Sequence, residues 1–233
     1  MNKIKLISFA LIILSSSFLL SACGKKTTTT TKATPTKTVQ KELVLSDVQK
    51  PIASLIPSTD GHNLKLKIEN IPSNINQMDY EVIYSAVDSG LEMEKGVGDT
   101  VKINSTSIEK DLLLGTASCT NGCKYKYDAG VTGGTLSLTF YTNDNQSVVY
   151  ETSFILKTSA DIKKDGGLSL VLENFKIKAT TTSKSDYFVV IKNFPAYYSV
   201  FSSGTGKGSV TTISPETVTK EDKTSLVGNY LIN

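Results

Sequence analysis

Three cysteines and one histidine are the residues of this 233-residue chain best suited to covalent or redox chemistry. Two of the cysteines, Cys119 and Cys123, flank a Thr-Asn-Gly segment, and an Asn-Gly pair favours a tight hairpin turn. In an exported chain this spacing favours a disulfide that closes the tip of a hairpin. A redox motif would have two residues between the cysteines, so free thiols and metal or redox chemistry are the weaker alternatives.

The single histidine, His62, lies in the turn-like segment STDGHN at residues 58–63. A Ser-His-Asp or Cys-His mechanism would need this side chain, and zinc would need about four ligands. The segment GTGKGS at residues 204–209 has the glycines of a phosphate loop, but strands flank it and no helix follows. We therefore predict two ordinary turns, no catalytic residue, no metal site and no cofactor.

Four acids, Asp88, Glu92, Glu94 and Asp99, gather in the segment DSGLEMEKGVGD. They could hold calcium or act as a carboxylate pair, yet their spacing matches no calcium-binding loop. A solvated hairpin is the prediction for residues 88–99. The chain has no arginine, so the bidentate contacts by which arginine holds phosphates are impossible, and nucleic acid is not a predicted partner.

The N-terminus has the pattern of an export signal. Lysines at positions 3 and 5 precede a mostly apolar run from Leu6 to Leu20, which is too short to span a bilayer comfortably. The run ends in Leu20-Ser21-Ala22-Cys23, which resembles the lipobox of bacterial lipoproteins. The resemblance implies that residues 1–22 are removed, that Cys23 is lipidated, and that the protein is held on the extracytoplasmic side of the cell membrane. An ordinary secretory leader and an uncleaved helical anchor are the alternatives.

The segment after Cys23 is predicted to be a flexible tether. Residues 24–41 contain eight threonines, five lysines, one proline and no acid, so they have little apolar surface to bury. A flexible coil of this length spans on the order of 20 to 25 Å. Two acyl chains on Cys23 would give a stable anchor in membrane lipid, at about 0.8 kcal/mol per buried CH₂.

From residue 42 onward, apolar and polar residues alternate in short runs, such as NLKLKIENI at 63–71 and GTLSLTFYTN at 134–143. About a dozen such runs with turn signals between them favour an all-β fold of antiparallel sandwiches. We predict two tandem modules of immunoglobulin-like or fibronectin-III-like type, at residues 42–159 and 160–233. The label rests on strand pattern, because the Cys-Trp-Cys hallmark of immunoglobulin domains is missing.

An internal likeness suggests that the modules are duplicates. LKLKIENI at Leu64 matches LSLVLENF at Leu168, DYEVI at Asp79 matches DYFVV at Asp186, and a weaker match sets residues 114–115 against 227–228. A chance likeness between strands is the alternative. If the alignment holds, residues 226–232 form the last strand of the second module, either as an uncovered edge suited to docking or as the final strand of a smaller closed sandwich.

Two classes of function remain. The first is a non-catalytic, membrane-anchored lipoprotein that acts as a spacer or protein-interaction module outside the cytoplasm. The second is a ligand-binding, calcium-binding or enzymatic lipoprotein with its site between the modules or at the acidic hairpin 88–99. We favour the first class, because the residues that common catalytic mechanisms require are missing.

Overall fold

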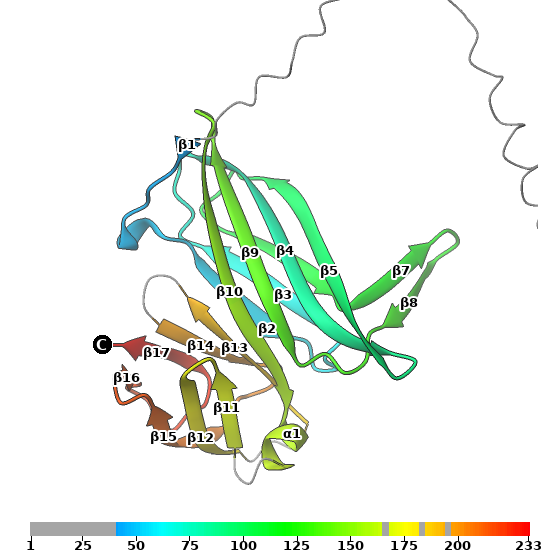
Figure 1. Ribbon diagram of the computed structural model, residues 1–233, viewed down its shortest axis with the longest axis vertical. Helices are drawn as coiled ribbons and strands as arrows, with labels where there is room; N and C mark the ends of the chain where they lie inside the picture. Colours follow the sequence, from blue (N-terminus) through cyan, green and yellow to red (C-terminus); the bar gives the residue numbers. More distant parts are fainter. Residues whose placement is uncertain (1–40, 165–167, 182–184, 194–196) are drawn as a thin grey trace, which may run out of the picture. The chain divides into compact units, whose positions relative to one another are not determined.

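The computed structural model describes residues 41–164, 168–181, 185–193 and 197–233 (Figure 1). The predicted leader, the Cys23 lipidation site and almost all of the predicted tether lie outside these residues. The described chain forms antiparallel sheets, with one short helix, α1 (Ser159–Lys164), and one 3-10 turn, η1 (Asp47–Gln49). The predicted all-β antiparallel fold is confirmed, and no described helix is long and apolar enough to cross a membrane.

A nine-stranded sheet dominates the fold, in the order β16-β17-β14-β13-β10-β9-β4-β5, with β1 parallel to β10. Its strands are β1 (Lys41–Glu42), β4 (Ile75–Asp88), β5 (Leu91–Lys102), β9 (Gly133–Thr142), β10 (Gln146–Thr158), β13 (Tyr187–Asn193), β14 (Tyr197–Ser202), β16 (Val218–Thr219) and β17 (Gly228–Ile232).

Three smaller sheets complete the fold. One contains β2 (Ile52–Pro57), β3 (Asn63–Glu69) and β6 (Ile108–Leu113), and another contains β11 (Leu168–Leu172), β12 (Phe175–Thr181) and β15 (Gly208–Ser214). The third is the pair β7 (Gly115–Cys119) and β8 (Cys123–Tyr127), which projects from the rest of the fold at the right of Figure 1.

Alternation in the sequence decides which face of each strand is buried. In β3, Leu64, Leu66 and Ile68 are fully buried, whereas Lys65 and Lys67 between them are partly exposed. The inward residues of β3 pack with those of β2, β4, β6, β9 and β10 in the first hydrophobic core. A turn at 143–145 joins β9 to β10, with Asn145 in a left-handed conformation at φ 56°.

A second hydrophobic core lies between β11, β12 and β15 and the part of the large sheet formed by β13, β14 and β17. Its aromatic centre is Phe175, which stacks on Tyr198 at 4.2 Å between ring centroids and meets Tyr230 edge-on at 5.3 Å. The Tyr230 hydroxyl donates a hydrogen bond to the Leu226 carbonyl at 2.8 Å, so this buried ring has its polar atom satisfied.

Strand β13 belongs to both cores. Val189 and Ile191 pack in the first core, whereas Phe188 and Val190 pack in the second. Because successive side chains of a strand point to opposite faces, the two three-stranded sheets must lie on opposite faces of the large sheet. The two halves are therefore joined by strand pairing between β10 and β13 as well as by the chain.

A buried polar chain ties β2 to the middle of the large sheet. The Ala53 backbone N–H donates to Asn193 Oδ1 at 2.8 Å, and Asn193 Nδ2 donates to Ser199 Oγ at 2.9 Å. The Ser199 hydroxyl then donates to Asn229 Oδ1 at 2.8 Å. These hydrogen bonds connect β2, β13, β14 and β17, so polar contacts as well as apolar contacts link the two halves.

The predicted duplication meets a geometric obstacle. Both halves share a pairing order, because β2-β3-β6 and β11-β12-β15 each consist of a hairpin plus a returning strand, and β4-β5 and β13-β14 are both hairpins. Strand β13 runs antiparallel to β4. The two hairpins also extend in opposite directions across the sheet, with β5 at one end and β14 toward the other. A half-turn about an axis perpendicular to the large sheet would place β4-β5 on β13-β14 and would leave the small sheet on the same face. The two small sheets instead lie on opposite faces. The halves have opposite hand, which argues against simple duplication.

The last strand is not an open edge. Strand β17 pairs with β14 on one side, and its last two residues, Leu231 and Ile232, pair with β16 on the other. The hypothesis that residues 226–232 form a docking edge therefore loses its basis. The first sequence match also falls on different positions, because Leu64 lies in the central strand β3 and Leu168 begins the edge strand β11.

Candidate functional site

The hairpin β7–β8 is the most exposed part of the described fold, and we call residues 115–127 the arm. All of its residues except Gly115 are exposed. The arm leaves the first core after Leu114, which is buried, and returns at Asp128, whose N–H donates to the Leu114 carbonyl at 2.9 Å. One backbone hydrogen bond thus closes the base of the arm.

The register of the arm gives it two unlike faces. Cys119 lies opposite Cys123, Ala117 opposite Tyr125, and Gly115 opposite Tyr127. Directly opposite residues in an antiparallel pair share a face, so all six lie on one side. Thr116, Ser118, Lys124 and Lys126 lie on the other side. The arm is therefore amphipathic, with an aromatic face and a polar face that carries two lysines.

The tyrosines form an exposed aromatic row that continues into the body of the protein. Tyr127 stacks on His62 with ring centroids 3.8 Å apart, and Tyr125 lies parallel to Tyr127 at 6.1 Å. Tyr125 is 54% exposed and Tyr127 is 44% exposed. Nδ1 of His62 lies 3.3 Å from an Asp60 carboxylate oxygen, in the turn between β2 and β3. The predicted turn histidine thus supports the root of the aromatic row.

A disulfide joins Cys119 to Cys123 at the tip of the arm, as the sequence predicts. Gly122 adopts φ 90° in the turn, a conformation that side chains with a Cβ rarely adopt. The bond closes the end of a two-stranded sheet that has little buried surface of its own. It therefore restricts the conformations of the part of the arm farthest from the core.

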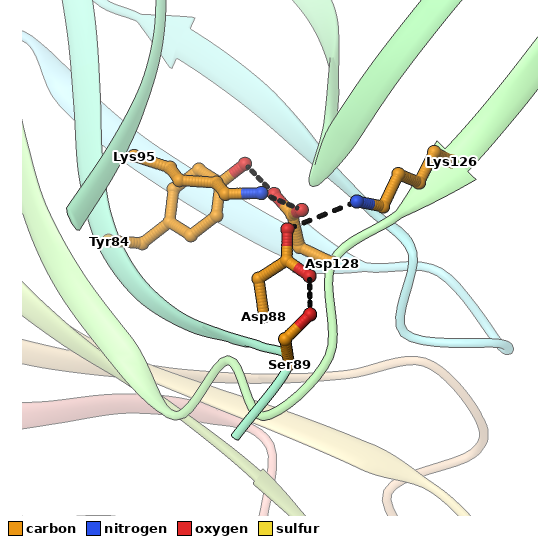
Figure 2. Close-up of polar contacts among 6 residues, drawn as sticks. All are labelled: Tyr84, Asp88, Ser89, Lys95, Lys126 and Asp128. Carbon is orange, nitrogen blue, oxygen red and sulfur yellow. Dashed lines mark hydrogen bonds and ion pairs between the residues drawn. The ribbon is translucent and has the colours of Figure 1, made fainter. Parts of the chain in front are cut away.

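A polar cluster holds the base of the arm against β4 and β5 (Figure 2). The Tyr84 hydroxyl donates to Asp128 Oδ2 at 2.9 Å, and the Lys95 ammonium donates to Asp128 Oδ1. The Asp128 side chain is only 3% exposed. Burial, followed by the hydrogen bond to Asp128, raises the pKa of Tyr84, so the phenol keeps its proton and donates at neutral pH.

A second, more exposed group lies beside this cluster. Lys126 Nζ donates to Asp88 Oδ2 at 3.0 Å, and Ser89 Oγ donates to Asp88 Oδ1 at 3.2 Å. The hydrogen bond from Lys126 is the main cause that lowers the pKa of Asp88. Because Lys126 is in β8 and Asp88 ends β4, this contact ties the arm to the β4–β5 hairpin.

The acids at 88–99 lie on the β4–β5 hairpin as predicted, but they do not form one site. Asp88 pairs with Lys126, and Asp99 accepts a hydrogen bond from the Thr100 N–H at 2.8 Å. Within the described residues, no group of three or more His, Cys, Asp or Glu side chains is placed to hold a metal ion. GTGKGS at 204–209 runs from the loop after β14 into the first two residues of β15, so it lies between two strands.

The functional residues that the sequence analysis missed are Tyr84, Lys95 and Asp128. They are far apart in the chain, and Tyr84 reads as one more inward residue of an alternating strand. The stretch CKYKY before Asp128 does carry a signal, since lysine and tyrosine alternate with period two and no residue of it is aliphatic.

Comparisons with protein-family models, with curated proteins and with solved structures return no match to this chain.

Proposed function

We propose that this chain is a membrane-anchored lipoprotein that acts outside the cytoplasm as a non-catalytic protein-interaction module, with the arm as its contact surface. The observation that carries the proposal is the arm itself, an amphipathic hairpin with two exposed tyrosines, closed by a disulfide. Contiguous exposed apolar surface marks interaction sites, and tyrosine is enriched in binding hot spots.

The construction of the arm supports a binding role. An isolated two-stranded hairpin is marginally stable in water, yet this one is held by a disulfide at its tip and by two polar groups at its base. These restraints reduce the conformational entropy that binding would otherwise cost. The same restraints engage Tyr84, Lys95 and Asp128 with one another, which supports a structural role for this cluster.

The chemistry of the arm indicates the kind of partner. Its aromatic face fits an apolar groove, and the exposed Lys124 on the other face favours an acid beside that groove. We therefore propose a protein partner with an apolar cleft bordered by carboxylates. The lipid anchor at Cys23, inferred from the lipobox, would hold the arm within reach of other proteins at the membrane surface.

The proposal is tested by photo-crosslinking in the native host. A photo-reactive amino acid at position 125 should give a discrete protein adduct, and the same residue at position 149 should not. Val149 is the matched control, because it is 60% exposed on β10, outside the arm. The purified partner should then bind the full chain, and Tyr125→Ala and Lys124→Glu should each weaken that binding. Equal adducts at both positions, or binding unchanged by both variants, would reject the arm as the contact surface.

We also propose that the fold consists of two sandwich units in tandem, at residues 42–159 and 160–233. Two separate hydrophobic cores, each between a three-stranded sheet and part of the large sheet, support this division. Because the two halves have opposite hand, their proposed likeness to immunoglobulin-like or fibronectin-III-like domains is limited to this two-layer arrangement.

A further inference from the structure

The strand β5 forms one end of the nine-stranded sheet, far from β16 at the other end. It is 12 residues long and pairs with β4 alone among the described residues. A long strand with one neighbour presents a row of unpaired backbone groups, and proteins usually cover or disrupt such edges. Leu91 and Met93 on this strand are also 70% and 47% exposed.

The turn at the start of β5 determines which backbone groups face outward. Ser89 and Gly90 form a two-residue turn with φ 53° and 84°, and Asp88 lies opposite Leu91. The two residues that flank such a turn form both backbone hydrogen bonds with each other. Along the strand, hydrogen-bonded pairs of this kind then alternate with pairs that form none. Odd-numbered residues therefore bond to β4, in agreement with the hydrogen bond from the Ile103 N–H to the Asn76 carbonyl at 2.8 Å. The outward N–H and C=O groups belong to Glu92, Glu94, Gly96, Gly98, Thr100 and Lys102.

We propose that β5 pairs antiparallel with β5 of a second copy of this chain, about a two-fold axis at Val97. In this register Glu92 faces Lys102 of the second copy, and each strand contributes the same pair. Gly96 faces Gly98, and both have outward backbone groups, so they can exchange hydrogen bonds. The edge is thus complementary to itself in charge and in hydrogen-bond phase.

The inward-facing side chains fit the same register. Met93 faces Val101 of the second copy, and Lys95, whose ammonium donates to Asp128 of its own chain, faces Asp99. Val97 and Val101 already pack against the first core, so the new contacts extend an apolar face that exists in one copy. The exposed part of Met93 would be covered by this pairing.

Other registers are less favourable. A shift by one position sets residues whose N–H and C=O groups point away from β4 opposite residues whose groups point toward β4. The hydrogen bonds between the two copies are then lost. With the axis at Lys95 or at Asp99, the like charges of the two copies face each other, which destabilises a cross-strand pair. With the axis at Gly96, Lys102 faces Gly90 and has no acidic residue opposite it. With the axis at Gly98, Val97 faces Asp99, which sets a charge against the apolar face. The axis at Val97 sets Lys102 opposite Glu92 and Met93 opposite Val101, so it matches both the charged and the apolar residues of the strand.

A second copy is favoured over an unrelated strand because this complementarity is specific to the sequence of β5. The paired surface is the same on both copies, so the interface is closed and consumes both edges. Among the described residues, β4 is the only strand that pairs with β5, so the outer edge of β5 has no strand partner. The inference does not depend on the arm or on the lipid anchor.

A charge-exchange experiment on the full chain in mild detergent tests this proposal. Sedimentation should show a dimer for the parent, and Glu92→Lys and Lys102→Glu should each raise the dissociation constant about tenfold or more, because each sets two like-charged pairs opposite each other. The double variant carrying both changes should restore the dimer. Both side chains are exposed, so neither change threatens the fold. A monomeric parent, or a double variant no tighter than the single variants, would overturn the proposal.

Disulfide trapping provides an independent measurement, in a chain with Cys23→Ser to remove that thiol. Val97→Cys lies on the proposed axis, where opposed Cα atoms of a non-hydrogen-bonded pair are about 4.5 Å apart, within disulfide reach. It should form covalent dimers on mild oxidation. Met93→Cys is the control, since it faces residue 101 of the second copy and should not couple with itself. Equal coupling of the two variants would count against the register, and coupling by Met93→Cys alone would overturn it.

Discussion

At the scale of single residues, Asp128 is the centre of the polar cluster at the arm. Its carboxylate is nearly inaccessible to water, and a buried charge is tolerated where it is paired and hydrogen-bonded. Lys95 supplies the opposite charge and Tyr84 supplies a second donor. The cluster therefore positions the chain at the point where the arm returns to the fold.

Removing the Asp128 carboxylate should cost more stability than removing one of its donors. Asp128→Ala leaves the Lys95 ammonium and the Tyr84 hydroxyl without their acceptor, which should lower the free energy of unfolding by about 1–3 kcal/mol. Tyr84→Phe removes one hydrogen bond and should cost about 1 kcal/mol. Urea denaturation of the two variants and the parent checks the order. An Asp128→Ala variant as stable as Tyr84→Phe would show that the ion pair contributes little.

The contact between Asp88 and Lys126 should make stability depend on pH. The hydrogen bond from Lys126 lowers the pKa of Asp88 in the folded state below its ordinary value of 3.8. The contact therefore stabilises the fold above that value, and its contribution disappears as the pH falls through the folded-state pKa. The stability difference between the parent and Asp88→Asn should be constant well above the ordinary pKa of 3.8 and shrink toward zero as the pH falls below it. A difference that does not change with pH would contradict this role.

At the scale of elements, the arm and β13 represent opposite extremes of burial. The arm is almost entirely exposed, whereas Phe188, Val189, Val190 and Ile191 of β13 are all fully buried. Elements with few buried contacts open locally without unfolding the rest of the protein. The arm should therefore have a local stability of its own, which the disulfide and the basal contacts determine.

Loss of the disulfide should affect the arm and leave the cores unchanged. For so short a loop, the chain-entropy estimate of the stabilisation is ~2 kcal/mol, or roughly 30-fold in the opening equilibrium. In a variant with Cys119→Ser and Cys123→Ser, amide hydrogen exchange at residues 116–126 should accelerate by up to that factor. The amides of β3 and β13 should exchange as they do in the parent. Acceleration across both cores would show that the arm supports the global fold.

At the scale of the whole molecule, the two cores depend on one shared sheet. The β10–β13 pairing crosses the boundary between the halves, and Ala53 in β2 hydrogen-bonds to Asn193 in β13. Neither half can keep its buried surface if β13 is displaced. The described residues accordingly belong to one compact unit.

Thermal unfolding should therefore occur in a single transition, despite the two cores. Ile191→Ala, in the first core, and Phe188→Ala, in the second, should each lower the free energy of unfolding by the roughly 2–5 kcal/mol typical of large-to-small changes in a core. Both should therefore lower the midpoint temperature of this one transition. Differential scanning calorimetry checks this. Two separate transitions, each sensitive to only one of the variants, would show that the halves unfold independently.

The proposed anchor makes a prediction for the full chain in its native membrane. Cys23→Ser should prevent lipidation and move the protein from the membrane fraction to the soluble fraction, because the remaining apolar run is too short for a stable span. Fractionation and mass spectrometry of the mature N-terminus measure both effects. A variant that stays in the membrane after its leader is cleaved would rule out anchoring through Cys23.

The sequence alone was sufficient for the local features of this protein. Alternation of period two predicted the strands and their buried faces, as in Leu64, Leu66 and Ile68, because burial of one face is decided within a few residues. The Asn-Gly pair between Cys119 and Cys123 predicted the disulfide-closed hairpin for the same reason. These features depend on neighbours in the chain, so a single sequence contains the information for them.

Only the tertiary structure decided which strands meet across long separations. The apolar run at 188–191 reads in the sequence as one more strand with a buried face, but its two faces fill two different cores. The meeting of Tyr84, Lys95 and Asp128, and the free edge at β5, likewise follow from the order of strands in the sheet. Strand order is selected by the packing of the whole chain, because many pairings satisfy the same alternation, and no short stretch of residues distinguishes between them.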